Sequence, residues 1–153
     1  EMKSKPILIQ DIANWFLCKE PMTHKKLQKL CYYTVAWGYA LNLGRIVEDD
    51  EFQAWVHGPV SPKLYAKYKG KGWNLILPDT CNNSELPKNL EELLESVWLT
   101  YGDKSGNELE ALSHNEKPWK EARDGLADDE RGEVVIPPKT MSTFYQTIFT
   151  GDL

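Results

Sequence analysis

Residues 23–42 have the sequence THKKLQKLCYYTVAWGYALN, and the rest of the chain is organised around them. This stretch predicts one helix of roughly five and a half turns. Thr23 is a suitable N-cap, because its hydroxyl can accept a hydrogen bond from an unpaired N–H of the first turn. One face of the predicted helix follows the i, i+3, i+4, i+7 spacing of a buried stripe: Leu27, Leu30, Cys31, Thr34, Trp37, Gly38 and Leu41. We therefore expect a central core helix.

The two halves of this helix differ in polarity. The first half has a polar face that we expect to lie in water: His24, Lys25, Lys26, Gln28 and Lys29. From Tyr32 onward apolar side chains surround the axis, which is typical of a buried helix. Gly38 lowers the helix propensity, so we expect another helix to pack closely there. The apolar run is too short, and too rich in tyrosine hydroxyls, for a membrane span.

The length of 153 residues predicts a single domain, residues 2–153, since Glu1 precedes Met2 and is excluded. The net charge of −5 is unevenly distributed, because residues 1–75 carry +4 and residues 76–153 carry −9. Both charged halves can be solvated faces that meet in the fold. Alternatively, the acidic half presents a surface to a basic partner.

The three cysteines, Cys18, Cys31 and Cys81, are far apart, and none has the spacing of zinc ligands. We therefore expect no metal and no cofactor. Cys18 and Cys31 lie in apolar helical patterns and are predicted to be reduced core residues. The sequence shows no signal peptide and no membrane span, so a cytoplasmic location is expected.

The remaining elements are mainly helical. Apolar periodicity predicts helices over residues 7–19, 89–100, 119–126 and 140–149, and a capping box at Ser105 opens another. Residues 45–47 and 52–55 predict a hairpin around the acidic turn Glu48–Glu51, with residues 134–136 as a possible third strand. Residues 57–60 predict a turn that leads into a helix, with Pro59 at its first position. Gly44 is the candidate C-cap of the central helix, and residues 78–87 are predicted to be an exposed loop.

These elements predict a mainly α (α+β) fold. We expect a single compact helical domain around a central buried helix, with a small β-hairpin or three-stranded β element.

Two groups of residues raise the question of catalysis. They are His57, in a turn, and Ser113–His114, between two short helices. A hydrolase would need one of these histidines within hydrogen-bond reach of a nucleophile, with an orienting carboxylate and an oxyanion hole. The sequence has no nucleophile elbow, phosphate-binding loop or HExxH motif. We expect structural roles for both histidines and keep a hydrolase as an alternative.

A second alternative is a DNA-binding repressor. Lys25, Lys26 and Lys29 could join the basic segment 63–71 to contact phosphates. The chain has no arginine cluster to read base edges. We therefore expect solvated lysines rather than a nucleic-acid surface.

Three blocks carry a resemblance to a known family: KLQKLCYY at 26–33, FQAWVHGPVSPKLY at 52–65 and ALSHNEKPWKEAR at 111–123. Together they resemble the Panacea domain family, also called the SocA-like antitoxin domain and found in phage-associated GepA-like proteins. The resemblance covers nearly the whole chain. The matched positions are Lys29, Leu30, Tyr33, Ala54, Trp55, Gly58, Pro59, Val60, Ser113, His114, Pro118 and Trp119, with His57 inside the second block.

The resemblance implies a non-enzymatic antitoxin of a bacterial or prophage toxin–antitoxin pair. Its partner would be a cognate toxin protein, neutralised by direct binding or by delivery to a AAA+ protease. Most matched positions are residue types that define a fold. The acidic segment 124–133 and the basic face are separate candidates for the toxin contact.

Overall fold

The computed structural model describes residues 5–81 and 86–149. Within these residues the chain forms seven α-helices, one short 3-10 helix and a two-stranded antiparallel sheet. This confirms the mainly α fold class with a small β element. In chain order the elements are α1 (Ile9–Lys19), α2 (His24–Ala40), β1 (Gln53–Trp55), β2 (Gly58–Val60), α3 (Pro62–Tyr68), η1 (Lys69–Lys71), α4 (Lys88–Tyr101), α5 (Gly106–His114), α6 (Lys117–Ala122) and α7 (Pro138–Ile148).

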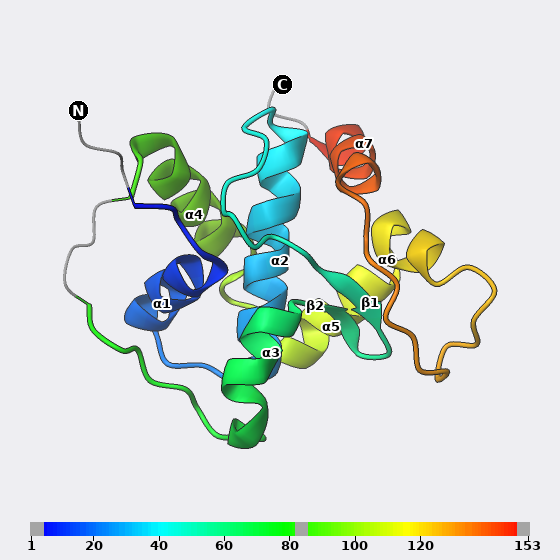
Figure 1. The fold of residues 1–153 in the computed structure, drawn as a ribbon, viewed down its shortest axis with the longest axis horizontal. Helices are drawn as coiled ribbons and strands as arrows, with labels where there is room; N and C mark the ends of the chain where they lie inside the picture. Colours follow the sequence, from blue (N-terminus) through cyan, green and yellow to red (C-terminus); the bar gives the residue numbers. More distant parts are fainter. Residues whose placement is uncertain (1–4, 82–85, 150–153) are drawn as a thin grey trace.

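Helix α2 lies at the centre of the molecule, with α1 and α4 on one side and α6 and α7 on the other (Figure 1). It contacts α1, α4, α5, α7 and β2. Every residue from Leu27 to Ala36 is buried, which confirms the prediction of a central buried helix. The Thr23 side chain accepts a hydrogen bond from the Lys26 N–H at 3.3 Å, as an N-cap does.

The C-terminal end of α2 differs from the prediction. Asn42, rather than Gly44, is the first left-handed residue after the helix, with φ 65°. The Leu43 N–H donates to the Gly38 carbonyl and the Asn42 N–H to the Tyr39 carbonyl, the pairing of a Schellman motif. The close contact expected at Gly38 is made by the loop after the helix, because a β-carbon there would lie 3.0 Å from Cγ2 of Ile46.

The hairpin is displaced along the sequence from its predicted position. Residues 45–47 form no strand, and β1 instead pairs with β2, with Ala54 opposite Pro59. Pro59 is therefore a strand residue, and the prediction that it starts a helix is wrong. Helix α3 begins at Pro62, and the Ser61 side chain caps it by accepting from the Leu64 N–H.

The predicted third strand is reduced to a short pairing along β1. Val135 forms a single antiparallel bridge with Gln53. The Ala54 N–H donates to the Val134 carbonyl, and the Ile136 N–H donates to the Phe52 carbonyl. Ile136 is buried by this pairing, while Val134 and Val135 remain exposed.

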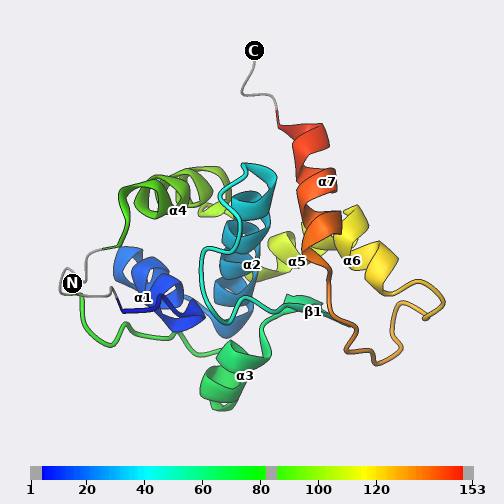
Figure 2. The ribbon, with the colours of Figure 1, turned by 45° about the horizontal axis from the view of Figure 1, so that its top comes forward.

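Helices α1 and α4 follow their predicted faces. The predicted apolar face of α1 is buried: Ile9, Ile12, Ala13, Phe16 and Leu17. In α4, Leu90, Leu93, Leu94 and Val97 are buried. The capping box of α5 is present, because Ser105 accepts from the Glu108 N–H and Glu108 accepts from the Ser105 N–H. In Figure 2, α7 rises beside α2 and α6 follows α5 around the same side.

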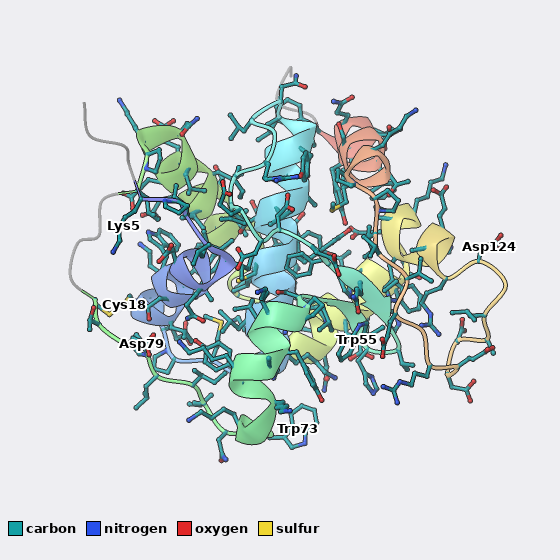
Figure 3. The ribbon with its side chains drawn as sticks, viewed as in Figure 1. Lys5, Cys18, Trp55, Trp73, Asp79 and Asp124 are labelled. Atoms are coloured by element: carbon teal, nitrogen blue, oxygen red, sulfur yellow. A yellow bond between two sulfur atoms is a disulfide. The ribbon has the colours of Figure 1, made fainter. Side chains whose placement is uncertain are left out.

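The prediction for Cys18 is wrong. Cys18 is exposed and forms a disulfide with Cys81, with their Cα atoms 5.7 Å apart. The buried face of α1 does not include Cys18, and the segment 78–81 returns to the exposed side of this helix (Figure 3). Cys31 is a free, buried thiol, as predicted, and burial raises its pKa. Four residues of the predicted exposed loop, 82–85, lie outside the described residues.

No helix of the described residues is long and apolar enough to cross a membrane.

Candidate functional site

The family-motif residues converge where the first half of α2 meets the β-hairpin and the α5–α6 corner. Three side chains lead into this region from distant parts of the sequence: Lys29 from α2, Trp55 from β1 and Trp119 from α6. Lys29 Nζ donates to the Pro59 carbonyl at 3.0 Å. Trp119 Nε1 donates to the Trp55 carbonyl at 2.7 Å. These two bonds hold both strands of the hairpin against the helices.

Lys29 is buried, contrary to the prediction that it lies on a wet face. Its relative exposure is 1%, and that of Gln28 is 2%. Burial lowers the pKa of Lys29 to about 7; Glu110 acts in the opposite direction and Lys25 adds to the lowering. No ion pair among the described residues includes Lys29. A helical wheel cannot anticipate this burial, because the residues that cover Lys29 come from a hairpin about thirty positions later.

Gly58 allows this close approach. Its φ is +108°, a conformation that L side chains rarely adopt. A β-carbon at Gly58 would lie 2.8 Å from Lys29 Cε and 3.2 Å from Ser113 Oγ. The strand backbone therefore packs directly against two motif side chains, and Ser113 itself donates to the Glu110 carbonyl at 3.0 Å.

Glu110 on α5 is the acidic partner of this region. Its carboxylate lies 2.5 Å from Lys25 Nζ and 3.1 Å from His57 Nδ1. Burial acts to raise the pKa of Glu110, but the hydrogen bonds from Lys25 and His57 outweigh it and lower the pKa. Sequence reasoning missed Glu110, because a glutamate on an amphipathic helix carries no local signal of its partners.

His114 lies against Trp119 rather than beside a nucleophile. The two rings stack with centroids 3.9 Å apart and an interplanar angle of 18°. Burial lowers the pKa of His114, and the charge of Glu110 opposes this effect. Pro118 and Trp119 are buried at the start of α6. These contacts give His114 a packing role at the α5–α6 corner.

Tyr33, one turn after Lys29 on α2, belongs to a second polar cluster. The hydroxyls of Tyr33 and Tyr145 donate to Glu116 Oε1 at 2.9 and 2.7 Å. Burial raises the pKa of Glu116, while the hydrogen bonds from Tyr145 and Tyr33 oppose this. Tyr33 also stacks on Tyr101 with centroids 4.1 Å apart. The cluster joins α2, α4, α6 and α7 through satisfied buried polar groups.

A pocket of about 530 Å³ opens beside Lys29, and we refer to it as the Lys29 pocket. Its lining combines aromatic and basic side chains from five segments: His24, Lys25, Lys29, Trp55, Val56, His57, Val60, Tyr65, Trp73 and Arg131 among others. The rings of Trp55 and Tyr65 contact each other edge to face, with centroids 4.8 Å apart. Figure 3 places Trp55 by the hairpin and Trp73 beyond α3, where its indole is 73% exposed.

Arg123 anchors the acidic segment 124–133. Its guanidinium donates to the Ala54 carbonyl at 3.1 Å, to the Ala127 carbonyl at 2.9 Å and also to the Glu130 carbonyl. Arg123 is 4% exposed, whereas most residues of the segment are exposed, as predicted. Arg123 was not singled out from the sequence, although it closes the block PWKEAR next to Trp119.

The three lysines at the start of α2 do not form the free basic surface that contact with DNA phosphates needs. At the start of α2, Lys25 pairs with Glu110 and Lys29 is buried. Lys26 donates to the Gly102 carbonyl at 2.6 Å. The lysines of α3 and η1 are exposed, but Lys67 there pairs with Asp79 at 3.1 Å.

A catalytic arrangement is also not found within residues 5–81 and 86–149. No hydrogen bond in this part of the chain joins His57 or His114 to a serine or cysteine side chain. The described residues likewise contain no group of three or more His, Cys, Asp or Glu side chains that could hold a metal ion. What the arrangement offers is a rigid framework with a pocket and an anchored acidic loop.

Comparison with known proteins identifies the family. The family model described as "Antitoxin SocA-like, Panacea domain" matches residues 27–120, which include the second motif block and most of the first and third. "Antitoxin SocA" of Caulobacter vibrioides (strain NA1000 / CB15N) is 30% identical over 126 residues, 71% of this chain. The chain covers 66% of that relative's length. No solved structure matches. The chain belongs to the antitoxin SocA-like, Panacea domain family.

Proposed function

We propose that this chain is the antitoxin of a toxin–antitoxin pair and neutralises a cognate toxin by binding it directly. Its membership of a family described as SocA-like antitoxins carries this proposal, together with the similarity to a curated antitoxin. The family suggests a non-catalytic regulator, so the toxin protein is the expected partner rather than a substrate.

The structure supplies two features that support protein binding. The acidic segment 124–133 is exposed yet fixed by Arg123, so it loses little conformational entropy when a partner docks on it. The Lys29 pocket offers exposed aromatic surface at Trp73, and aromatic residues are enriched among binding hot spots. The exposed Leu75 and Leu77 extend this apolar surface along the chain.

The test is co-expression with the product of the neighbouring gene. We expect that gene product to arrest growth alone, and this chain to restore growth and to be recovered in a stable complex with it. Growth arrest without rescue and without a complex would contradict the proposal for that pair. A complex with the chain, but unchanged growth, would show binding without neutralisation.

Delivery of the toxin to a AAA+ protease is a second route to the same outcome. It is distinguished by repeating the rescue in a host that lacks the protease. Rescue that persists with an unchanged toxin level indicates sequestration. Rescue that disappears, with the toxin accumulating, indicates an adaptor.

A further inference from the structure

The Lys29 pocket contains a buried cation that the described part of the chain does not neutralise. Lys29 Nζ has one hydrogen-bond partner there, the Pro59 carbonyl at 3.0 Å. An ammonium has three donors, and burying its charge without an ion-pair partner costs several kcal/mol. Glu110, whose charge acts on Lys29, already pairs with Lys25 and His57. The fold therefore buries an amine whose charged form no ion pair of the described residues compensates.

The position of Lys29 in the pocket wall allows it to bind an anion. Lys29 forms part of the pocket wall, beside the aromatic and aliphatic side chains of Trp55, Val60 and Tyr65. An anion that reaches Lys29 loses part of its contact with water, and a charge pair interacts more strongly there than in bulk water. Lys25 and Arg131 also line the pocket, but each is already paired with a glutamate, Glu110 and Glu133 respectively.

The lining also selects among anions. Phosphate groups are usually bound by arginine forks or by several backbone N–H donors, and Arg131, the one arginine of the lining, pairs with Glu133 and is 89% exposed. Glu133 lines the pocket too, which disfavours a dianion. A single carboxylate on a short aliphatic stem matches one buried ammonium beside the apolar surfaces of Trp55, Val60 and Tyr65.

We propose that the Lys29 pocket receives an aspartate or glutamate side chain of the toxin, with the Lys29 ammonium as its ion-pair partner. This inference rests on the proposed function, because it assigns the residue that recognises the toxin.

The first test measures toxin affinity by titration calorimetry with the full chain and the purified toxin of the pair. Lys29→Met keeps the length of the side chain and removes the charge, so it should fold while weakening toxin binding about 30-fold or more. Lys63→Met removes an exposed lysine of α3 and is the matched control, expected to change affinity less than threefold. Val56→Trp fills the pocket without touching the charge and should weaken binding similarly to Lys29→Met.

The second test identifies the toxin group. Each exposed Asp or Glu of the toxin is changed to Asn or Gln and combined with Lys29→Met in a double-mutant cycle. The proposal is supported if the change of one toxin Asp or Glu weakens binding to the unchanged chain but has little effect on binding to Lys29→Met. The toxin's C-terminal carboxylate is tested by a one-residue extension that moves it away from its position. If Lys29 couples only to this carboxylate and to no Asp or Glu side chain, the proposal is overturned.

The outcomes separate this inference from the proposed function. If Lys29→Met and Val56→Trp bind the toxin as tightly as the unchanged chain, the pocket assignment is wrong and the antitoxin function stands. If the unchanged chain neither binds nor neutralises the toxin, both are wrong.

Discussion

The backbone of Gly58 lies directly against the side chain of Lys29, so closely that a β-carbon at Gly58 would be 2.8 Å from Lys29 Cε. The two residues belong to different motif blocks and to different elements, β2 and α2. Their contact is what closes the hairpin over the buried lysine. The main-chain carbonyl of Pro59, the next residue, accepts a hydrogen bond from Lys29 and holds the strand in this position.

Gly58→Ala is expected to destabilise the fold by about 3 kcal/mol, from an unfavourable φ and a steric clash combined. In a Lys29→Ala background the clash is removed, so the same change should cost only about 1–2 kcal/mol. Chemical denaturation of the wild-type chain, the two single variants and the double variant measures this coupling. Equal costs in both backgrounds would show that the two residues do not touch.

Lys29→Met is expected to change how stability depends on pH. Lys29 has a pKa near 7 in the fold and about 10.5 when unfolded, so between these values the unfolded chain binds the extra proton. The wild-type chain should gain stability as pH rises from 7 to 9.5, by at most about 1.4 kcal/mol per pH unit. Lys29→Met lacks this gain, and it should be the more stable protein at pH 7 and below.

Urea denaturation at several pH values checks this prediction. The quantity to compare is the difference between the two proteins, because Cys31 and the buried tyrosines affect both equally. If the difference in unfolding free energy between Lys29→Met and the wild-type chain does not shrink toward pH 9.5, then Lys29 is not a desolvated, charged group.

Arg123→Lys is expected to release the acidic segment 124–133. A lysine cannot donate to the carbonyls of Ala54, Ala127 and Glu130 at once, whereas the guanidinium does. Amide hydrogen exchange should become faster in residues 126–134, and unfolding should cost about 2–3 kcal/mol less. Arg131→Lys is the control, because Arg131 is 89% exposed and pairs only with Glu133. Unchanged exchange in Arg123→Lys would contradict the anchoring role.

The sequence predicted the elements that have long regular patterns. The buried stripes of α1, α2 and α4 extend over more than two turns, so their periodicity is clear. The capping residues Thr23 and Ser105 were also predicted, because an N-cap depends on its own next three residues.

What could not be predicted depends on contacts between distant residues. Strands of three residues are too short to show a period, and both Arg45–Val47 and the true partner Gly58–Val60 fit a hairpin with Gln53–Trp55. The burial of Lys29 and the pairing of Cys18 with Cys81 depend on segments that return from thirty and sixty-three positions away. The site residues were found through the motif blocks, whereas Glu110 lies outside these blocks and was missed.

The disulfide gives a further prediction. Reduction, or Cys18→Ser, should lower stability by up to about 4 kcal/mol, because the bond closes a loop of 63 residues in the unfolded chain. Under oxidising conditions the native protein should show one thiol, Cys31, which becomes reactive only after unfolding. Peptide mapping without reductant should recover Cys18 linked to Cys81, and two free thiols at these positions would contradict the pairing. Cys31→Ala serves as a control that leaves the linked peptide intact.

The most direct measurement of the central claim is titration of the purified toxin with the purified chain, reading complex formation and toxin activity together. The account predicts a defined stoichiometric complex and loss of toxin activity in step with complex formation, with no protease present. Full toxin activity at saturating amounts of the chain, with no complex detected, would contradict neutralisation by direct binding.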